Sequence, residues 1–114
     1  MKLFGIKTCD TCRKALKALE GAGKPVTFVD LRGDDFTSRD LNRWLAAQGW
    51  DTLLNRRSTS WRALDDADKQ NLDEAKARAL MLATPTLIKR PVIETDDAII
   101  VGFGKPQQDA LIKS

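Results

Sequence analysis

The chain has 114 residues, enough for one domain with a single hydrophobic core, because most domains hold about 50 to 250 residues. Its hydrophobic fraction of 42% and charged fraction of 31% are typical of a folded globular protein and exclude the composition of a disordered chain. The net charge of +3 is the sum of positive and negative residues that are spread along the sequence. The chain has no block of basic residues of the kind that binds nucleic acid, so no nucleic-acid partner is expected.

The first third of the chain predicts a strand, a helix and a second strand. Residues 2–6 alternate and are apolar enough for a strand, and a helix is expected to begin just after them, capped by Thr8 or Asp10. Apolar residues then recur at helical spacing until two glycines end the helix. Residues 26–29 form a β-branched and aromatic run that is typical of a strand. These elements predict a βαβ unit with a right-handed crossover.

The middle of the chain predicts a helical insert over about residues 37–83. One helix is expected to start at Thr37 and stop at Gly49, and a loop rich in arginine and hydroxyl groups follows over residues 53–61. The pattern is helical again over residues 65–82 and ends before a Thr-Pro pair. The apolar side of this last helix is expected to hold Leu72, Ala75, Ala79 and Leu82.

The last third predicts a β-hairpin and a terminal helix. Residues 86–93 and 98–101 are two extended runs, separated by a turn at Asp96 and Asp97. Pro106 suits the first turn of a helix that is expected to end at about Lys113.

The two cysteines, Cys9 and Cys12, form a C-x-x-C pair where the first strand meets the first helix. This spacing beside a βαβ pattern is typical of thioredoxin-like redox sites. The start of a helix stabilises an anion, so Cys9 is expected to be a nucleophilic thiolate. Cys12 lies on the same face and could resolve a mixed disulfide formed by Cys9, or it could simply pack as a small buried apolar residue.

The sequence predicts neither a metal site nor a bound cofactor. Histidine is absent and the chain has only two cysteines, so a structural zinc ion would lack two of its four ligands. No glycine-rich loop of the nucleotide-binding kinds is present. No segment approaches the roughly 18 apolar residues of a membrane span, and the start is too weakly apolar for a signal peptide, so we expect a cytoplasmic protein with no membrane partner.

Three ordered motifs carry a resemblance that covers essentially the whole chain. The segments TCDTCRK at 8–14, LLNRRSTSWR at 53–62 and TPTLIKRPV at 84–92 resemble the ArsC/Spx arsenate reductase-like family, and most closely its YffB branch. The resemblance implies one thioredoxin-like α/β domain over residues 1–114. Its mixed four-stranded sheet would combine the βαβ unit with the hairpin and the terminal helix, with the insert at about 37–83.

The resemblance also implies a set of site residues. Cys9 matches the catalytic cysteine of the family, and Arg90 matches an arginine that lies opposite it before a cis proline. The residues alone favour a solvated strand position for Arg90, although an arginine beside a thiolate would lower the pKa of that thiol. Together with Cys12, Arg90 completes the expected catalytic set. The candidate residues for binding a substrate or an anion are Arg13, Arg56, Arg57, Pro91 and Lys105, of which Arg56 and Arg57 could also be plain surface residues.

Two departures from the arsenate reductases bear on the activity. Asn55 stands where those enzymes have an arginine, and Lys105 precedes Pro106 where they have a second one; lysine supplies only a point charge to an oxyanion. We therefore expect a monomeric glutathione-dependent thiol/disulfide reductase, with glutathione or another small thiol as co-substrate and a disulfide or an oxyanion as substrate. The alternatives are an arsenate reductase and an Spx-like redox sensor that binds RNA polymerase.

Overall fold

The computed structural model describes residues 1–33 and 35–112, with the side chain of Ile112 left aside. The described chain divides into two compact units. The first unit holds the N-terminal residues to Phe36 together with the residues from Arg90 onward, and the second unit is Thr37–Lys89. The division falls near the expected borders of the insert, while the single-domain organisation stays a prediction.

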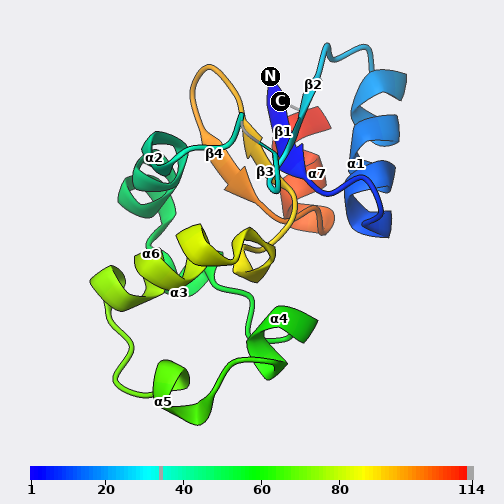
Figure 1. Ribbon diagram of the computed structural model, residues 1–114. Coiled ribbons are helices and arrows are strands. Elements are labelled where there is room, and N and C mark those ends of the chain that lie inside the picture. Colours follow the sequence, from blue (N-terminus) through cyan, green and yellow to red (C-terminus); the bar gives the residue numbers. More distant parts are fainter. Residues whose placement is uncertain (34, 113–114) are drawn as a thin grey trace. The chain divides into compact units, whose positions relative to one another are not determined.

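The first unit is built on a four-stranded mixed sheet (Figure 1). Its strands are β1 (Lys2–Gly5), β2 (Thr27–Asp30), β3 (Val92–Glu94) and β4 (Ile99–Val101), in the order β2-β1-β3-β4. β1 pairs with β2 in parallel and with β3 in antiparallel fashion, and β3 and β4 form the hairpin. The expected mixed sheet is therefore confirmed, with strands somewhat shorter than the sequence pattern suggests.

Two helices cover one face of this sheet. They are α1 (Asp10–Gly21) and α7 (Lys105–Ile112). The expected end of the terminal helix at Lys113 lies outside the described residues. Burial of apolar side chains between the helices and the sheet supplies the main stabilisation of this layer. The core cluster consists of Leu3, Cys12, Ala15, Leu19, Ile93 and Leu111.

The start of α1 differs from the sequence expectation. Cys9 itself occupies the N-cap position, in place of the expected Thr8 or Asp10. Thr8 therefore is not the cap, and Asp10 lies in the first turn, where its carboxylate pairs with Arg13. This placement brings the Cys9 sulfur to the end of the helix where unpaired backbone N–H groups gather.

The second unit is helical. The expected helix from Thr37 to Gly49 is confirmed as α2, and the Thr37 backbone N–H donates to the Asp40 carboxylate at 2.9 Å. Leu41 and Trp44 are fully buried on its inner side. The elements are α2 (Ser38–Gln48), α3 (Trp50–Leu53), α4 (Thr59–Arg62), α5 (Asp66–Lys69), α6 (Glu74–Ala83) and the 3₁₀ turn η1 (Pro85–Leu87).

The expected helix over residues 65–82 is wrong as one element, because the chain leaves the helical path between α5 and α6. Asn71 adopts a left-handed backbone with φ of 54°, and the Asp73 side chain then starts α6 by accepting the Lys76 backbone N–H at 2.8 Å. Because α6 starts at this new point, its buried side differs from the one expected for a single helix, and Ala77 and Met81 are the residues that are fully buried. Of the four residues expected on the apolar side, Leu72 precedes the helix and Ala75 and Ala79 are exposed.

Two further expectations in the second unit are corrected. The loop over residues 53–61 contains the start of α4, where the Ser58 hydroxyl accepts the Trp61 backbone N–H at 3.1 Å. Residues 86–88 are not part of a strand, since Pro85 opens the 3₁₀ turn and Ile88 makes only an isolated bridge to Leu54. Among the described residues, no helix is long and apolar enough to cross a membrane.

Candidate functional site: the thiol pair at the start of α1

The loop between β1 and α1 fixes the position of Cys9. The Cys9 backbone N–H donates to the Ile6 carbonyl at 3.0 Å, and the Cys9 carbonyl accepts the Arg13 N–H at 3.0 Å as the first helical bond. The Cys9 side chain is half-buried, whereas Cys12, one turn later, is only 1% exposed. Both cysteines are free thiols. One thiol is thus accessible to a reactant and the other lies in the core.

The surroundings of Cys9 favour its thiolate. Burial raises the pKa of the Cys9 thiol, but hydrogen bonds from the Cys12 backbone N–H, the Cys12 thiol and the Arg90 guanidinium outweigh burial and lower the pKa below its ordinary value of 9.0. The positive charge of Arg90 acts in the same direction. Since the thiolate is the attacking form of cysteine, Cys9 is the one of the two thiols whose surroundings favour nucleophilic attack.

The surroundings of Cys12 have the opposite effect. Burial raises the pKa of the Cys12 thiol to about 11, and the neighbouring Cys9 adds to the rise, although a hydrogen bond from the Ile6 backbone N–H works against it. At neutral pH Cys12 is therefore a protonated thiol. The two cysteines therefore have different environments: that of Cys9 favours the thiolate, and that of Cys12 favours the neutral thiol.

Gly5, the last residue of β1, lies beside the thiol pair and was not among the residues predicted for the site. A Cβ atom at this position would lie 2.5 Å from the Cys12 sulfur, closer than side chains tolerate. Only glycine lets the thiol approach the strand so closely. The signal that could have pointed to it is a glycine within a strand, which often marks the close approach of another group.

The expected cis peptide bond between Arg90 and Pro91 is present. It leads directly into β3, which pairs with β1, and so carries Arg90 to the Cys9 thiol from far along the chain. Pro91 is buried, and its carbonyl accepts the Gly102 backbone N–H at 2.7 Å. The structure therefore brings together Cys9, Cys12, Arg90 and Pro91 of the expected site residues.

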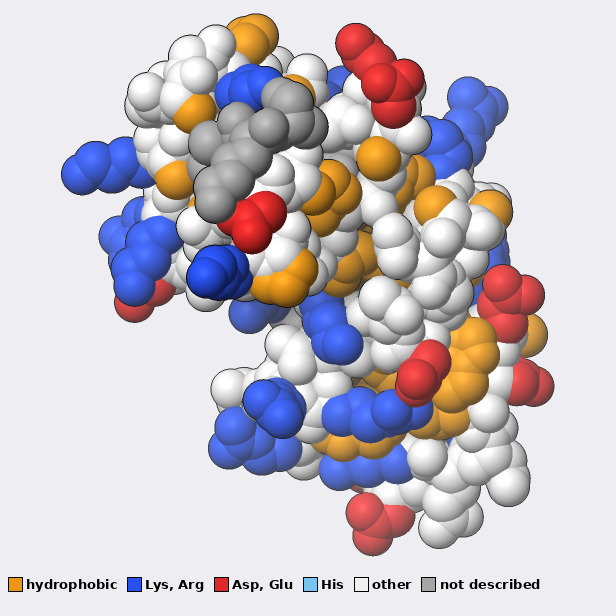
Figure 2. All heavy atoms as spheres, turned by 180° about the vertical axis from the view of Figure 1, so that it is seen from behind, with side chains coloured by type: hydrophobic (Ala, Val, Ile, Leu, Met, Phe, Trp, Pro, Cys, Tyr) orange, Lys and Arg blue, Asp and Glu red, His pale blue; other side chains and the backbone are white. Residues whose placement is uncertain are grey.

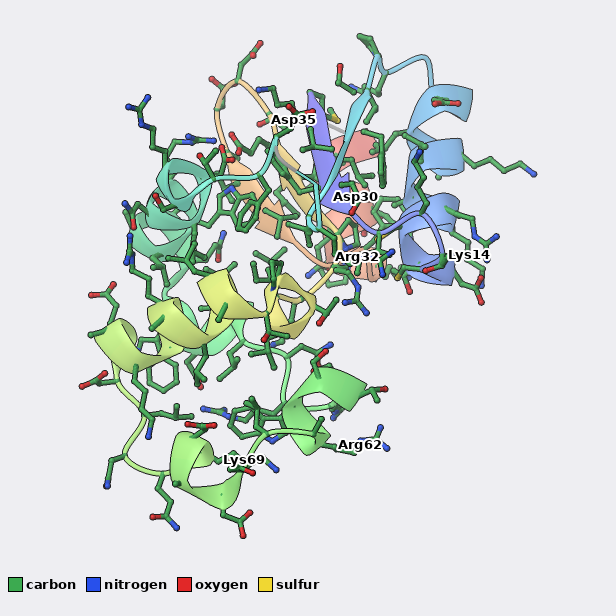
Figure 3. The ribbon with its side chains drawn as sticks, viewed as in Figure 1. Lys14, Asp30, Arg32, Asp35, Arg62 and Lys69 are labelled. Carbon is green, nitrogen blue, oxygen red and sulfur yellow. The ribbon has the colours of Figure 1, made fainter. Side chains whose placement is uncertain are left out.

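The remaining expected residues of the first unit lie on the surface. Arg13 is exposed and paired with the Asp10 carboxylate, and Lys105 is exposed at the start of α7. Lys14 also projects outward from α1, and Arg32 lies beside Asp30 just past the end of β2 (Figure 3). Figure 2 shows that Lys and Arg side chains are interspersed with Asp and Glu over the visible face. The anion-binding roles of Arg13 and Lys105 stay predictions.

Arg56 and Arg57 belong to the second unit. Arg56 pairs with the Asp51 carboxylate at 2.9 Å and lies over the Trp50 ring, with its guanidinium carbon 5.7 Å from the ring centroid. Arg57 is exposed, and its backbone N–H donates to the Asn55 side chain at 3.0 Å. The Arg56 side chain thus has a local structural role, whereas the contact of Arg57 is made by its backbone, and the part of both residues in anion binding stays a prediction.

An apolar pocket lies beside Cys12, with Phe28 of β2 in its lining. Lys7 and Arg13 border this pocket with the aliphatic parts of their side chains, and the other lining residues are apolar apart from the Cys12 thiol. Cys12 reaches this pocket although almost none of its surface is exposed. The lining residues are Ile6, Lys7, Cys12, Arg13, Leu16 and Phe28.

A mixed sheet, a C-x-x-C pair at a helix N-terminus and a cis proline before β3 define a thioredoxin-like thiol protein. Comparison with known proteins narrows this class. The profile of the ArsC family matches residues 4–111. The solved structure of a YFFB protein superposes with a TM-score of 0.90 at 44% identity, over 97% of each chain. The chain therefore belongs to the ArsC family, in its YffB branch.

Other relatives span a range of described roles. An uncharacterised protein of Haemophilus influenzae is 40% identical over 95% of each chain. An arsenate reductase (ArsC) related protein of Brucella melitensis is 42% identical, with a TM-score of 0.78 over 99% of this chain and 94% of that one. The global transcriptional regulator Spx of Staphylococcus epidermidis is 25% identical over 92% of this chain and 81% of its own. The family and the site together support a thiol-based oxidoreductase in general terms.

Proposed function

We propose that this protein is a glutathione-dependent thiol/disulfide reductase whose nucleophile is the Cys9 thiolate. The observation that carries the proposal is the placement of the Cys9 sulfur, which accepts hydrogen bonds from Cys12 and Arg90 at the start of α1. A thiol held in this way is ionised more fully at neutral pH than a free cysteine and attacks disulfides faster.

The proposed reaction proceeds through one mixed disulfide. The Cys9 thiolate attacks the glutathione sulfur of a mixed disulfide between glutathione and a substrate thiol, so a Cys9–glutathione disulfide forms and the substrate thiolate leaves. That thiolate takes a proton from water. A second glutathione thiolate then attacks the bound glutathione sulfur, which releases glutathione disulfide and restores the Cys9 thiolate. In each turnover the substrate thiol is released and one glutathione thiol is oxidised, and the glutathione already held in the mixed disulfide becomes the other half of glutathione disulfide.

The chemistry of glutathione matches the charges around Cys9. Glutathione carries two carboxylates and a thiol, and carboxylates pair well with arginine and lysine. Lys7 and Arg13 lie two residues before and four residues after Cys9 in the chain, they border the pocket beside Cys12, and both side chains are exposed to solvent. In the proposal they attract the carboxylates while the glutathione sulfur meets Cys9.

The test is reductase turnover with a mixed disulfide of glutathione and 2-mercaptoethanol. Wild type is expected to turn over with glutathione and to slow strongly when cysteine replaces glutathione at the same thiolate concentration. Cys9→Ser should abolish turnover because it removes the nucleophile. Thr8→Ala is the matched control, since Thr8 is exposed and caps nothing. Equal turnover by wild type and Cys9→Ser would contradict the proposal.

A second candidate function is redox-sensing regulation of the Spx kind. It is supported by the C-x-x-C pair and by the similarity to Spx of Staphylococcus epidermidis. In this alternative, oxidation of Cys9 and Cys12 to a disulfide would change binding to RNA polymerase. Binding of the purified protein to the RNA polymerase α subunit, measured in reduced and oxidised states, tests it. The high pKa of the Cys12 thiol favours the enzyme, because a protonated buried thiol forms a disulfide slowly.

Arsenate reduction has weaker support. Asn55 and Lys105 stand where the resemblance places arginines in arsenate reductases, and a tetrahedral oxyanion is held best by paired arginines. Arsenate-dependent oxidation of glutathione by the purified protein would establish this activity.

A further inference from the structure

We propose that Gly5 and Cys12 are positioning residues for Cys9: the absent side chain at Gly5 lets the Cys12 thiol rest on the β1 backbone and donate its S–H to the Cys9 sulfur. Cys12 then stays a thiol throughout the catalytic cycle instead of resolving the mixed disulfide. This inference rests on the proposed reductase function, but its central contact can be tested without turnover.

Cys12 is anchored on the strand β1 through its sulfur. The Ile6 backbone N–H donates to the Cys12 sulfur, and a Cβ atom on Gly5 would lie 2.5 Å from the same sulfur. Any side chain at position 5 would push the sulfur away from the Ile6 N–H. Glycine at this position is therefore required for the anchoring bond, and no positive φ explains its presence.

The hydrogen bond between the two thiols runs from Cys12 to Cys9. Cys12 is 1% exposed and belongs to the core cluster with Leu3 and Ala15, so its thiol is kept neutral by burial. A neutral thiol can donate its single proton, and the Cys9 thiolate is the acceptor beside it. The chain of contacts runs from the Ile6 N–H through the Cys12 thiol to the Cys9 sulfur.

The position of Cys12 disfavours its attack on a Cys9 mixed disulfide. To attack a Cys9 mixed disulfide, Cys12 would have to lose its proton in the core and leave the Ile6 N–H. A second glutathione meets neither obstacle, because Cys9 is half-buried and open to solvent. Its thiolate attacks the glutathione sulfur of the Cys9 mixed disulfide, the bond to Cys9 breaks, and the electron pair returns to the Cys9 sulfur. Cys12 neither gains nor loses electrons in this cycle.

The main experiment follows the alkylation rate of Cys9 against pH, with the modified cysteine assigned by mass spectrometry. Cys12→Ala removes the donor and is expected to raise the apparent pKa of Cys9 by about one unit. Cys12→Ser keeps an O–H donor and should shift the profile by less than about half as much. An unchanged profile in Cys12→Ala would overturn the proposal, and a merely structural role for Cys12 would not separate alanine from serine.

Gly5→Ala tests the anchoring step and should shift the profile in the same direction as Cys12→Ala. Gly21→Ala is the matched control, because a Cβ atom there meets nothing within 4 Å. It should leave the pH profile unchanged. If Gly5→Ala does not fold, the serine and alanine variants of Cys12 still decide the matter.

Turnover separates this inference from the function on which it rests. Cys12→Ser should retain glutathione-dependent turnover within about tenfold of wild type and should form no lasting Cys9–glutathione adduct. Accumulation of that adduct with loss of turnover would show that Cys12 is the resolving thiol and would overturn the inference. If wild type has no turnover with glutathione, the proposed function fails, while the alkylation profiles continue to decide whether Gly5 and Cys12 position Cys9.

Discussion

Replacing Arg90 by glutamine should change the reactivity of Cys9 in opposite directions at low and high pH. Arg90 donates a hydrogen bond to the Cys9 sulfur and places a positive charge beside it, and both effects lower the pKa of the thiol. Glutamine keeps a polar side chain but is shorter than arginine and has no charge, so both the hydrogen bond and the charge are removed. The pKa of Cys9 in Arg90→Gln should therefore rise toward that of a free cysteine.

The magnitude follows from the environment of Cys9. An adjacent arginine shifts an acidic group by about 1 to 3 units, and the half-buried position of Cys9 favours the lower end, about one unit. One unit reduces the thiolate fraction about tenfold at low pH, which is about 1.4 kcal/mol. The less acidic thiolate is intrinsically about threefold more nucleophilic, since reactivity rises with pKa with a slope of about 0.4 to 0.5. The net change is about threefold slower alkylation at low pH and about threefold faster alkylation at high pH.

The assay is alkylation by iodoacetamide from pH 5 to pH 10, with modification of Cys9 followed by mass spectrometry. Arg39→Gln, an exposed arginine of α2, is the control for loss of one positive charge and should match wild type. The pH profiles of wild type and Arg90→Gln are expected to cross. Profiles that superimpose, or that differ by one constant factor at every pH, would refute the role assigned to Arg90.

Three further predictions concern stability. In a Cys9→Ser background, the free energy of unfolding should fall by roughly 1–2 kcal/mol between pH 9 and pH 11. The reason is that the pKa of Cys12 is higher in the folded than in the unfolded protein, so the thiol of the unfolded protein ionises first as the pH rises. Urea unfolding measures this fall, which should disappear when Cys12→Ala is added. Asp73→Ala removes the side chain that starts α6 and should cost about 1 kcal/mol, whereas Asp65→Ala, which removes no capping bond, should cost less in the same urea experiment. Leu19→Ala leaves a cavity in the core under α1 and should cost about 2–4 kcal/mol, measured by thermal or urea unfolding; a loss below about 1 kcal/mol would contradict the packing described.

Much of the local structure could be predicted from residue patterns. The helix from Thr37 to Gly49 follows from its apolar spacing and from residues that commonly start and stop helices. The helix over residues 65–82 failed because the same apolar pattern continues through Asn71 and Asp73, where a left-handed residue and a capping side chain break it. Two or three polar residues hardly change the helical periodicity of an 18-residue segment, but a single residue with a left-handed backbone is enough to divide the helix.

For the site, the sequence alone determined that a cysteine stands at the start of the first helix, because that depends only on neighbouring residues. Tertiary structure decided the rest. Arg90 meets Cys9 because antiparallel pairing aligns Val92 with Phe4, so a distant segment begins beside the cysteine loop. By its spacing Cys12 could be a resolving thiol or a core residue; the structure places it in the core against Gly5, and its redox role stays a prediction. Helical spacing fixes the direction of a side chain, whereas its pKa depends on what the rest of the fold places around it.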